Sequence, residues 1–332
     1  MDDFARFNLI GKSPAFLCAL VLIRKFATCD ATVLIQGATG TGKELAARAI
    51  HYLSPRRDFP FIPVNCGALP DNLVESELFG HVRGAFTDAK EANAGLVAHA
   101  RGGTLFLDEI EAMNSRAQVV LLRFIQDKEY RPVGGATVRE GNVRIVAASN
   151  ADLSTMVREK SFRADLLFRL NALSVHLPLL AQRPGDVVVL AQSFLDRLND
   201  QADQPAKIFD HNSLEMLNSY SWPGNVRELE NVVQREFLLA ADQIIRISSV
   251  ESDAPASYEA ARGGSFLDQG FKSAKARAIA QFEREYIVTL LSETRGNLSL
   301  ASRLSGKDRR DIGKLLKKHG VERQQFAPRN ES

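Results

Sequence analysis

The chain has 332 residues, 45% of them hydrophobic and 25% charged, as in soluble globular proteins with two or three domains. No stretch approaches the roughly 18 apolar residues of a membrane span, and the N-terminus has no signal-peptide pattern, so we expect a cytoplasmic protein without a membrane partner. The three cysteines, Cys18, Cys29 and Cys66, have no metal-ligand spacing, and we expect them to be buried as small hydrophobic residues.

The net charge of +2 is divided unevenly along the chain. Residues 265–332 contain 14 Lys and Arg against 8 Asp and Glu, whereas the preceding residues contain 28 against 32. A basic C-terminal segment on an acidic body predicts a nucleic-acid-binding module attached to a domain with another function.

Residues 15–29 have a helical pattern, and a short apolar run and a glycine-rich loop follow it. The run at residues 33–35 predicts a buried strand, and residues 44–50 have the composition of a helix. Between them stand Gly37, Ala38, Thr39, Gly40, Thr41, Gly42 and Lys43. Strand, loop and helix in this order predict a phosphate-binding loop, because backbone N–H groups, the helix dipole and Lys43 all attract phosphate. The usual motif continues with Ser or Thr as a magnesium ligand, but Glu44 stands there.

Further apolar runs alternate with helical patterns up to residue 177. The predicted strands are residues 61–64, 102–109, 143–147 and 174–177, and residues 117–127 have the spacing of a helix. This alternation predicts an α/β domain with a parallel sheet, whose ligand lies at the carboxyl ends of the strands.

Polar residues stand where several of these strands end. Asp108 and Glu109 follow a strand, where one carboxylate can hold magnesium through water and its neighbour can orient or deprotonate an attacking water. The alternative is a pair of solvated turn residues. Asn65 and Asn150 end two other strands and should face the same crevice, although each could be an ordinary turn residue.

Three arginines are further candidates. Arg163 and Arg169 lie six residues apart in a segment with apolar spacing, and each could instead form an ordinary surface ion pair. Arg227 begins a helix of the next domain, from which it could reach back over a nucleotide.

After residue 184 the strand patterns stop. Residues 186–198, 210–219 and 225–240 predict a small all-helical domain, and residues 248–270, rich in Ser, Ala, Gly and Asp, predict a linker. Helices are then predicted at residues 282–291, 298–304 and 309–319, the last two joined by a turn. This is a helix-turn-helix pattern, with seven Lys and Arg against two Asp between residues 303 and 318. A solvated basic helical hairpin is the alternative. The predicted DNA contacts are Lys307, Arg309, Arg310 and Lys314.

Six segments occur in the order of one known family. They are LIQGATGTGKELAARAIH, PFIPVNCGALP, ESELFGHVRGAFTDA, GGTLFLDEIE, FRADLLFRLN and WPGNVRELENVV. Together they resemble the AAA+ domain of bacterial sigma-54-dependent transcription activators over residues 7–247. The resemblance implies a P-loop sheet of strand order 5-1-4-3-2, a helical lid and a ring of subunits, commonly six. The C-terminal segment resembles, more weakly, the Fis-type helix-turn-helix domain of the same family.

The resemblance also implies site roles. Residues 37–43 would bind ATP, and Glu44 is usual in this family. Asp108 would be the residue that holds Mg²⁺, Glu109 the one that activates water, and Asn65 a switch that holds Glu109. The remaining roles fall on sensor residues Ser149, Asn150 and Arg227, and on Arg163 and Arg169 as arginine fingers that reach the neighbouring subunit's ATP.

A surface loop of this family contacts sigma-54 through the motif GAFTGA. The matching residues here are Gly84, Ala85, Phe86, Thr87, Asp88 and Ala89. An exposed Phe86 between small residues suits insertion into a pocket of the partner. Asp88 replaces a glycine and adds a negative charge beside this anchor. The loop could therefore be a relic in a regulator that no longer uses sigma-54.

We therefore predict an ATP- and Mg²⁺-dependent activator that remodels sigma-54 RNA polymerase from enhancer DNA. The predicted domains are residues 1–182 (ATPase), 183–247 (lid), 248–270 (linker) and 271–332 (DNA binding). Only about six residues precede the first family segment, so we expect regulation by a partner protein, a paralogous subunit in a mixed ring, or expression level. The alternatives are a DNA-binding regulator of another polymerase holoenzyme and an AAA+ machine of the helicase-loader or protease kind, which Phe86, Thr87 and the basic tail disfavour.

Overall fold

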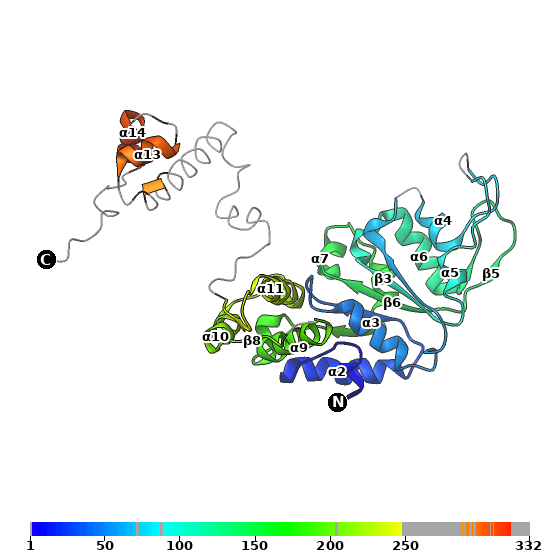
Figure 1. Cartoon of the computed structure of the whole chain (residues 1–332). Coiled ribbons are helices and arrows are strands. Elements are labelled where there is room, and N and C mark those ends of the chain that lie inside the picture. The colour runs from blue at the N-terminus through cyan, green and yellow to red at the C-terminus, as the bar shows by residue number, and fades with distance from the viewer. Residues whose placement is uncertain are drawn as a thin grey trace. The chain divides into compact units, whose positions relative to one another are not determined.

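The computed structural model describes residues 2–70, 73–86, 89–202, 205–247, 287, 290–291, 294, 297–305, 307 and 309–319 (Figure 1). The chain divides into two compact units, Met1–Asp253 and Ala254–Ser332. The predicted linker at residues 248–270 lies outside the described residues, as does most of the helix predicted at residues 282–291.

A five-stranded parallel sheet forms the centre of the first unit. Its strands are β1 Val33–Gln36, β2 Phe61–Asn65, β3 Thr104–Asp108, β6 Arg144–Ser149 and β7 Leu173–His176. They lie in the order β2-β3-β6-β1-β7, which is the expected 5-1-4-3-2 when the five strands are numbered along the chain. The predicted parallel P-loop sheet is therefore confirmed. The three central strands β1, β3 and β6 are short apolar runs buried on both faces, which is why the sequence pattern located them, whereas the edge strands β2 and β7 are only partly buried.

Helices cover both faces of this sheet, because alternate residues of each strand point to opposite sides. Val33, Ile35 and Val146 pack against one pair of helices, whereas Leu34, Leu107 and Ala147 belong to the core under the other helices. The first pair is α2 Pro14–Ala27 and α3 Lys43–Tyr52. The opposite face carries α4 Val74–Phe79, α5 Leu96–His99, α6 Ser115–Asp127 and α8 Ala164–Leu170 (Figure 1).

Several short elements complete this part of the chain. They are α1 Asp2–Ala5, η1 Cys66–Ala68, η2 Ile110–Ala112, α7 Leu153–Arg158 and the antiparallel pair β4 Glu129–Tyr130 and β5 Arg139–Glu140. The pair was not predicted, because two residues are too few to show a strand pattern. The expectation that all cysteines are buried is wrong for Cys18 and Cys29, which are exposed; only Cys66 is buried.

The rest of the first unit, residues 180–247, is a small subdomain that we call the lid. It contains η3 Leu180–Gln182, α9 Asp186–Gln201, α10 His211–Ser219 and α11 Asn225–Leu239 around a core with the buried Trp222. The prediction of an all-helical domain is wrong in one detail. Two short strands, β8 Ile208–Phe209 and β9 Ile244–Ile245, pair in parallel beside the helices, and each is too short to be seen in the sequence.

A buried ion pair joins the lid to the N-terminal segment. Asp186 Oδ2 accepts a hydrogen bond from Arg183 Nε at 2.9 Å, and both side chains are almost fully buried. Asp186 also accepts bonds from the backbone N–H and the hydroxyl of Ser13, and Arg183 donates to the carbonyl of Ile10. A Cβ on Gly11 would lie 2.6 Å from Arg183 Nη2, so only glycine fits there.

The second unit contains α13 Leu298–Ser305 and α14 Arg309–His319, close to the predicted bounds. Asn297 caps α13, since its side-chain oxygen accepts the N–H of Leu300. Ile312 and Leu316 face a small core that includes Ile287, Leu290, Leu291 and Ala301. In the parts of both units that the structure describes, no helix is long and apolar enough to cross a membrane.

The ion pair leads to a prediction about stability. Burial alone would raise the pKa of Asp186, but hydrogen bonds from Lys12, Arg183 and Ser13 outweigh it and hold this pKa below its usual value. Asp186→Asn should lower the free energy of unfolding by about 3 kcal/mol, because it leaves the guanidinium of Arg183 buried without a charge partner. Chemical denaturation measures this loss.

The contribution of Asp186 to stability should depend on pH in one direction. A depressed carboxyl pKa stabilises the fold at pH values above the unfolded-state pKa of about 4, and this stabilisation is lost as the pH falls through the lower folded-state pKa. The Asp186→Asn variant should therefore lack this acid-dependent component. Asp196→Asn, an exposed carboxylate on the same helix, is the control. Equal losses in the two variants would contradict the importance of the ion pair.

Candidate active site

The loop after β1, residues 37–43, wraps around the start of α3. Gly40 and Gly42 have φ of 79° and 95°, which side-chain-bearing residues rarely adopt. Lys43 is buried, and its Nζ donates to the carbonyls of Gly37 at 2.8 Å and Ala38 at 3.2 Å. Burial lowers the pKa of Lys43, although the nearby carboxylates of Asp108, Glu111 and Glu109 oppose this shift. The loop therefore holds its cation in place beside a row of carboxylates.

The carboxylates come from the end of β3, the second strand from β1 in the sheet. Asp108 is half-buried and accepts a bond from the N–H of Glu109 at 3.0 Å. Burial raises the pKa of Asp108, and repulsion from Glu109 and Glu111 adds to the rise, whereas the Glu109 N–H and Lys43 lower it. Glu109 has a φ of 53°, so the chain turns sharply there. The side chains of Asp108 and Glu109 therefore point in different directions.

Asn65, at the end of β2, lies opposite Asp108 in the register of the sheet. Its side-chain oxygen accepts the N–H groups of Gly67 at 2.8 Å and Ala68 at 3.2 Å, so it caps a turn. A Cβ on Gly67 would lie 3.0 Å from Glu109 Oε2 and 3.3 Å from Asn65 Oδ1, so the two side chains approach the same glycine. The predicted switch between Asn65 and Glu109 stays a prediction.

The end of β6 supplies Ser149 and Asn150. Ser149 is fully buried and its hydroxyl bonds the backbone of Ala151, whereas Asn150 is exposed at the sheet edge. The N–H of Asn150 donates to Glu111 Oε1 at 3.2 Å, and Glu111 Oε2 is buried without a partner among the described residues. Glu111 was not among the residues predicted from the sequence. It could have been noticed as a third acid close behind Asp108 and Glu109, in the segment that follows β3 at the carboxyl edge of the sheet.

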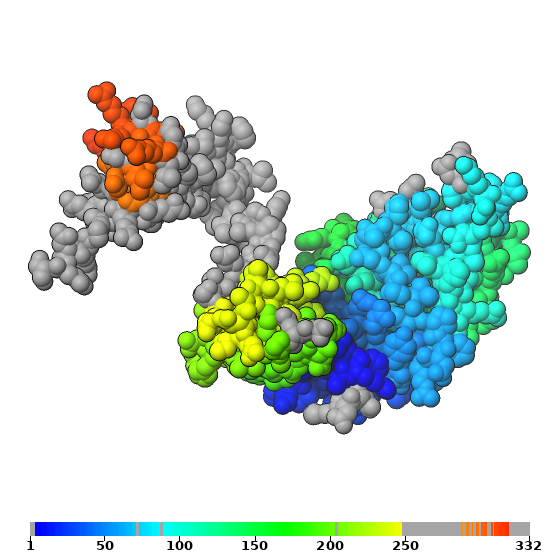
Figure 2. Space-filling view, in the orientation of Figure 1, coloured from blue at the N-terminus to red at the C-terminus, as the bar shows by residue number. Residues whose placement is uncertain are grey.

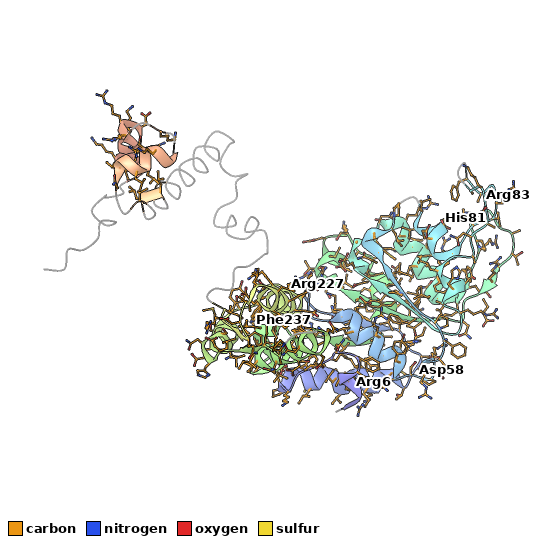
Figure 3. The ribbon with its side chains drawn as sticks, viewed as in Figure 1. Arg6, Asp58, His81, Arg83, Arg227 and Phe237 are labelled. Atoms are coloured by element: carbon orange, nitrogen blue, oxygen red, sulfur yellow. The ribbon has the colours of Figure 1, made fainter. Side chains whose placement is uncertain are left out.

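One pocket brings most of these side chains together with the lid. Its lining residues are Thr39, Gly40, Gly42, Lys43, Glu44, Leu45, Asp108, Glu109, Asn150, Val226, Arg227 and Glu230. Arg227 lies on the side of α11 that faces the sheet domain (Figure 3). Glu44 points partly outward and pairs with Arg48 at 2.7 Å. The pocket thus combines a phosphate-binding loop, two carboxylates at a strand end and a cation from the lid.

The two arginines of the α8 region lie elsewhere. Arg163 and Arg169 are exposed and do not line the pocket of their own chain. Arg163 forms a double hydrogen bond with Asp165 at 3.0 and 2.7 Å, as in the surface ion pair considered above. Arg169 has no side-chain partner among the described residues, and the neighbouring Phe168 is 82% exposed. Of the two, Arg169 is the one free to contact another molecule.

The loop that contains Phe86 projects from one end of the sheet domain (Figure 2). It is held by a second loop, since Val82 donates to the carbonyl of Val133 at 3.1 Å and Val133 donates to Gly80 at 2.8 Å. The expectation of an exposed Phe86 is wrong, because the side chain is half-buried and its ring lies 4.9 Å from that of His81.

His81 holds this contact in place, since its Nδ1 bonds Ser76 Oγ of α4 at 2.7 Å. Figure 3 labels His81 and, farther out on the projection, Arg83. Gly84, Ala85 and Ala89 complete the turn with backbone hydrogen bonds, and Thr87 and Asp88 lie outside the described residues.

Comparison with known protein families matches two regions of the chain. Residues 9–176 match the family "Sigma-54 interaction domain", and residues 181–263 match the "AAA+ ATPase lid domain". Among relatives, the transcriptional regulatory protein GlrR of Escherichia coli is 40% identical over 98% of this chain and 71% of its own length. The response regulator protein PilR of Pseudomonas aeruginosa is 42% identical over 95% of this chain and 70% of its own.

Solved structures of a related protein have the same fold. Crystal structures of NtrX from Brucella abortus superpose with TM-scores of 0.70 alone, 0.71 in complex with ADP and 0.69 in complex with ATP, at 29–31% identity. These matches cover 94–96% of this chain and 69–70% of NtrX.

The raised pKa of Asp108 gives a prediction about this site. An acid with a raised pKa destabilises the fold when ionised, so Asp108→Asn should raise the midpoint of thermal unfolding by about 2 °C at pH 7 without ligand. The asparagine oxygen can still accept the N–H of Glu109. The gain should shrink as the pH falls through the folded-state pKa, where Asp108 becomes neutral.

Scanning calorimetry at several pH values measures this gain. Asp127→Asn, at an exposed position at the end of α6, is the control. A lower midpoint for Asp108→Asn than for Asp127→Asn at pH 7 would contradict the prediction.

Proposed function

Because this chain belongs to the family of sigma-54-dependent transcriptional regulators and is an AAA+ ATPase, we propose that it hydrolyses ATP to remodel sigma-54 RNA polymerase at promoters. One observation carries the proposal. A single pocket gathers Lys43, Asp108 and Arg227 from the sheet domain and the lid, and the same domain carries the projecting Phe86 loop. The proposed nucleotide pocket and the proposed partner-binding loop thus belong to one α/β domain.

The pocket's residues fit ATP with Mg²⁺. Lys43 and the N–H groups of the phosphate loop would hold the phosphates, and Asp108 would hold Mg²⁺ through water. The described residues contain no cluster of three acids, histidines or cysteines that could hold a metal by themselves. One carboxylate together with substrate phosphates is the usual way in which proteins bind magnesium. The bound Mg²⁺ would neutralise charge on the phosphates.

Glu109 is the proposed base for the attacking water. It lines the pocket one residue beyond Asp108, on a turn that separates the two carboxylates. Asn65, which approaches the same glycine, would set the orientation of Glu109, and Asn150 and Arg227 would contact the phosphates from the other walls. Arg227 would link the lid position to the nucleotide, because it is the lid's cation in the pocket.

A second copy of the chain would complete the site. Arg169 is exposed, has no side-chain partner among the described residues and lies outside its own pocket. Supplied to a neighbour, it would stabilise the charge that develops on the transferred phosphoryl group. A ring, commonly of six in this family, would give every pocket one such arginine, from the same chain or from a paralogous subunit.

The arginine finger is testable by mixing variants. Arg169→Ala should bind ATP nearly normally but hydrolyse it about a thousandfold more slowly, as in other enzymes that lose a finger. Arg163→Ala should cost less, because Arg163 is paired with Asp165. Glu109→Gln should bind ATP without hydrolysis. Mixing Arg169→Ala with Glu109→Gln should restore part of the activity, because the second supplies its arginine to the intact Glu109 of the first. No recovery at any mixing ratio would refute action in trans.

The projecting loop is the proposed sigma-54 contact. The start of this loop is held against the second loop by the backbone bonds of Gly80 and Val82 with Val133, and Phe86 packs on His81. An aromatic side chain that is half-buried before binding can move from an internal contact into a partner's pocket. The loop would then change its position with the nucleotide state.

Open-complex formation by purified sigma-54 RNA polymerase tests the proposed function. Phe86→Ala should abolish it while ATP hydrolysis stays near normal, because Phe86 lies outside the pocket. Asp88→Gly should keep or raise activity, since glycine restores backbone freedom. Phe59→Ala, at an exposed phenylalanine of the same unit outside this loop, is the control. A fully active Phe86→Ala would favour a regulator of another polymerase holoenzyme.

DNA binding is proposed for the second unit. Arg309, Arg310 and Lys314 are exposed on α14, and Lys307 is exposed in the turn before it. Helical spacing places Arg310 and Lys314 on the side away from the buried Ile312 and Leu316, and Arg309 at the start of the helix. Such a basic helix face suits the major groove and its phosphates. The unit would hold the ATPase at enhancer DNA.

A further inference from the structure

A tight turn in the lid, residues 222–225, touches the phosphate loop. Trp222 and Asn225 have φ of 51° and 53°, although neither is glycine. Two left-handed residues within four positions are unfavourable and persist only where the surroundings hold them. Trp222 is buried in the lid core and donates its indole N–H to the carbonyl of Leu217 at 2.8 Å. The first end of the turn is therefore fixed by the lid itself.

The second end is fixed by the side chain of Asn225, which is buried. Its amide Nδ2 donates to the carbonyl of Thr39 at 3.0 Å, in the phosphate loop. Its Oδ1 accepts the N–H of Leu180 at 2.9 Å, where the chain enters the lid. One side chain thus joins the phosphate loop, the lid entrance and the start of α11.

The backbone repeats the connection one residue later. The N–H of Val226 donates to the carbonyl of Gly40 at 3.0 Å, so the phosphate loop caps the first turn of α11. A Cβ on Gly40 would overlap the carbonyl oxygen of Gly224, so the approach needs glycine. The next residue, Arg227, lines the pocket.

These two bonds also orient the loop. In a trans peptide the C=O and the following N–H point in opposite directions. Because the carbonyls of Thr39 and Gly40 point to the lid, the N–H groups of Gly40 and Thr41 point away from it. The contact with the lid therefore sets which way these two N–H groups of the phosphate loop face, and that of Thr41 donates to the carbonyl of Ala38 at 3.4 Å.

We propose that Asn225 is a positioning residue for ATP binding and hydrolysis, which fastens the phosphate loop to the lid and places Arg227 over the pocket. This inference rests on the proposed ATPase function. Asn225 contacts no substrate in this arrangement; it acts through the loop and through Arg227. A movement of the carbonyls of Thr39 and Gly40 would break or drag their bonds to Asn225 and Val226. The phosphate loop and the start of α11 are therefore expected to move together.

Asn225→Asp tests the proposal. The new carboxylate keeps the acceptor for Leu180 N–H but replaces the donor to Thr39 with an acceptor, so oxygen faces oxygen. ATP affinity, measured by titration calorimetry on the full chain, should fall about tenfold, the effect of losing one hydrogen bond and leaving a buried acceptor unpaired. Asn225→Ser, which keeps a short donor, should lose less.

Asn199→Asp is the matched control. Asn199 in α9 donates to the carbonyl of Lys207 and accepts the N–H of Lys207, both at 2.8–2.9 Å, but it touches only the lid. It should lower thermal stability to a similar extent as Asn225→Asp while leaving ATP affinity unchanged. Equal ATP affinities for the two variants would refute a positioning role for Asn225.

A double-mutant cycle distinguishes positioning from general damage. If Asn225 acts partly by placing Arg227, then Asn225→Asp should have little further effect on ATP hydrolysis in an Arg227→Ala background. Fully multiplicative losses would show that the two residues act independently and would overturn this part of the proposal. Failure of the wild-type chain to bind or hydrolyse ATP would instead refute the proposed function.

Discussion

The nucleotide site depends on the placement of the buried Lys43 side chain. Its ammonium group is held by the carbonyls of Gly37 and Ala38, and it faces carboxylates from the end of β3. This arrangement exists only because β6 alone separates β1 from β3 in the sheet, which brings their carboxyl ends to one edge. Within one chain the remaining cation of the pocket is Arg227 of the lid. The need for further positive charge at the phosphates would make both the lid and a neighbouring subunit part of the same site.

The strands and the main pocket residues could be predicted from local sequence patterns, and the order of the strands from the family resemblance. Buried parallel strands are continuous apolar runs, and a phosphate loop has fixed spacing, so local patterns located Lys43 and Asp108. Asn225 could not be found in this way. Its importance lies in bonds to Thr39 and Leu180, 186 and 45 residues away in the chain, and these depend on tertiary structure. The contact between His81 and Phe86 was missed for a similar reason, since exposure of a loop residue is decided by its neighbours in space.

The lid and the projecting loop are attached to different parts of the sheet domain. Asn225 and Val226 bind the lid to the phosphate loop, whereas Ser76 and His81 bind the projecting loop to α4. Both connections consist of few hydrogen bonds around buried or half-buried side chains. A small change at the phosphates could therefore shift the lid through its bonds to the loop without unfolding the core, which suits an enzyme that converts hydrolysis into movement.

In the proposed function, one chain holds the nucleotide but needs a second chain to hydrolyse it. The most direct measurement is the ATP hydrolysis rate per chain as a function of chain concentration, at saturating ATP and Mg²⁺. The rate per chain should rise steeply with concentration and then level off as subunits assemble, with the mass of the assembly rising over the same range. A constant rate per chain, down to concentrations at which light scattering finds only single chains, would contradict the account.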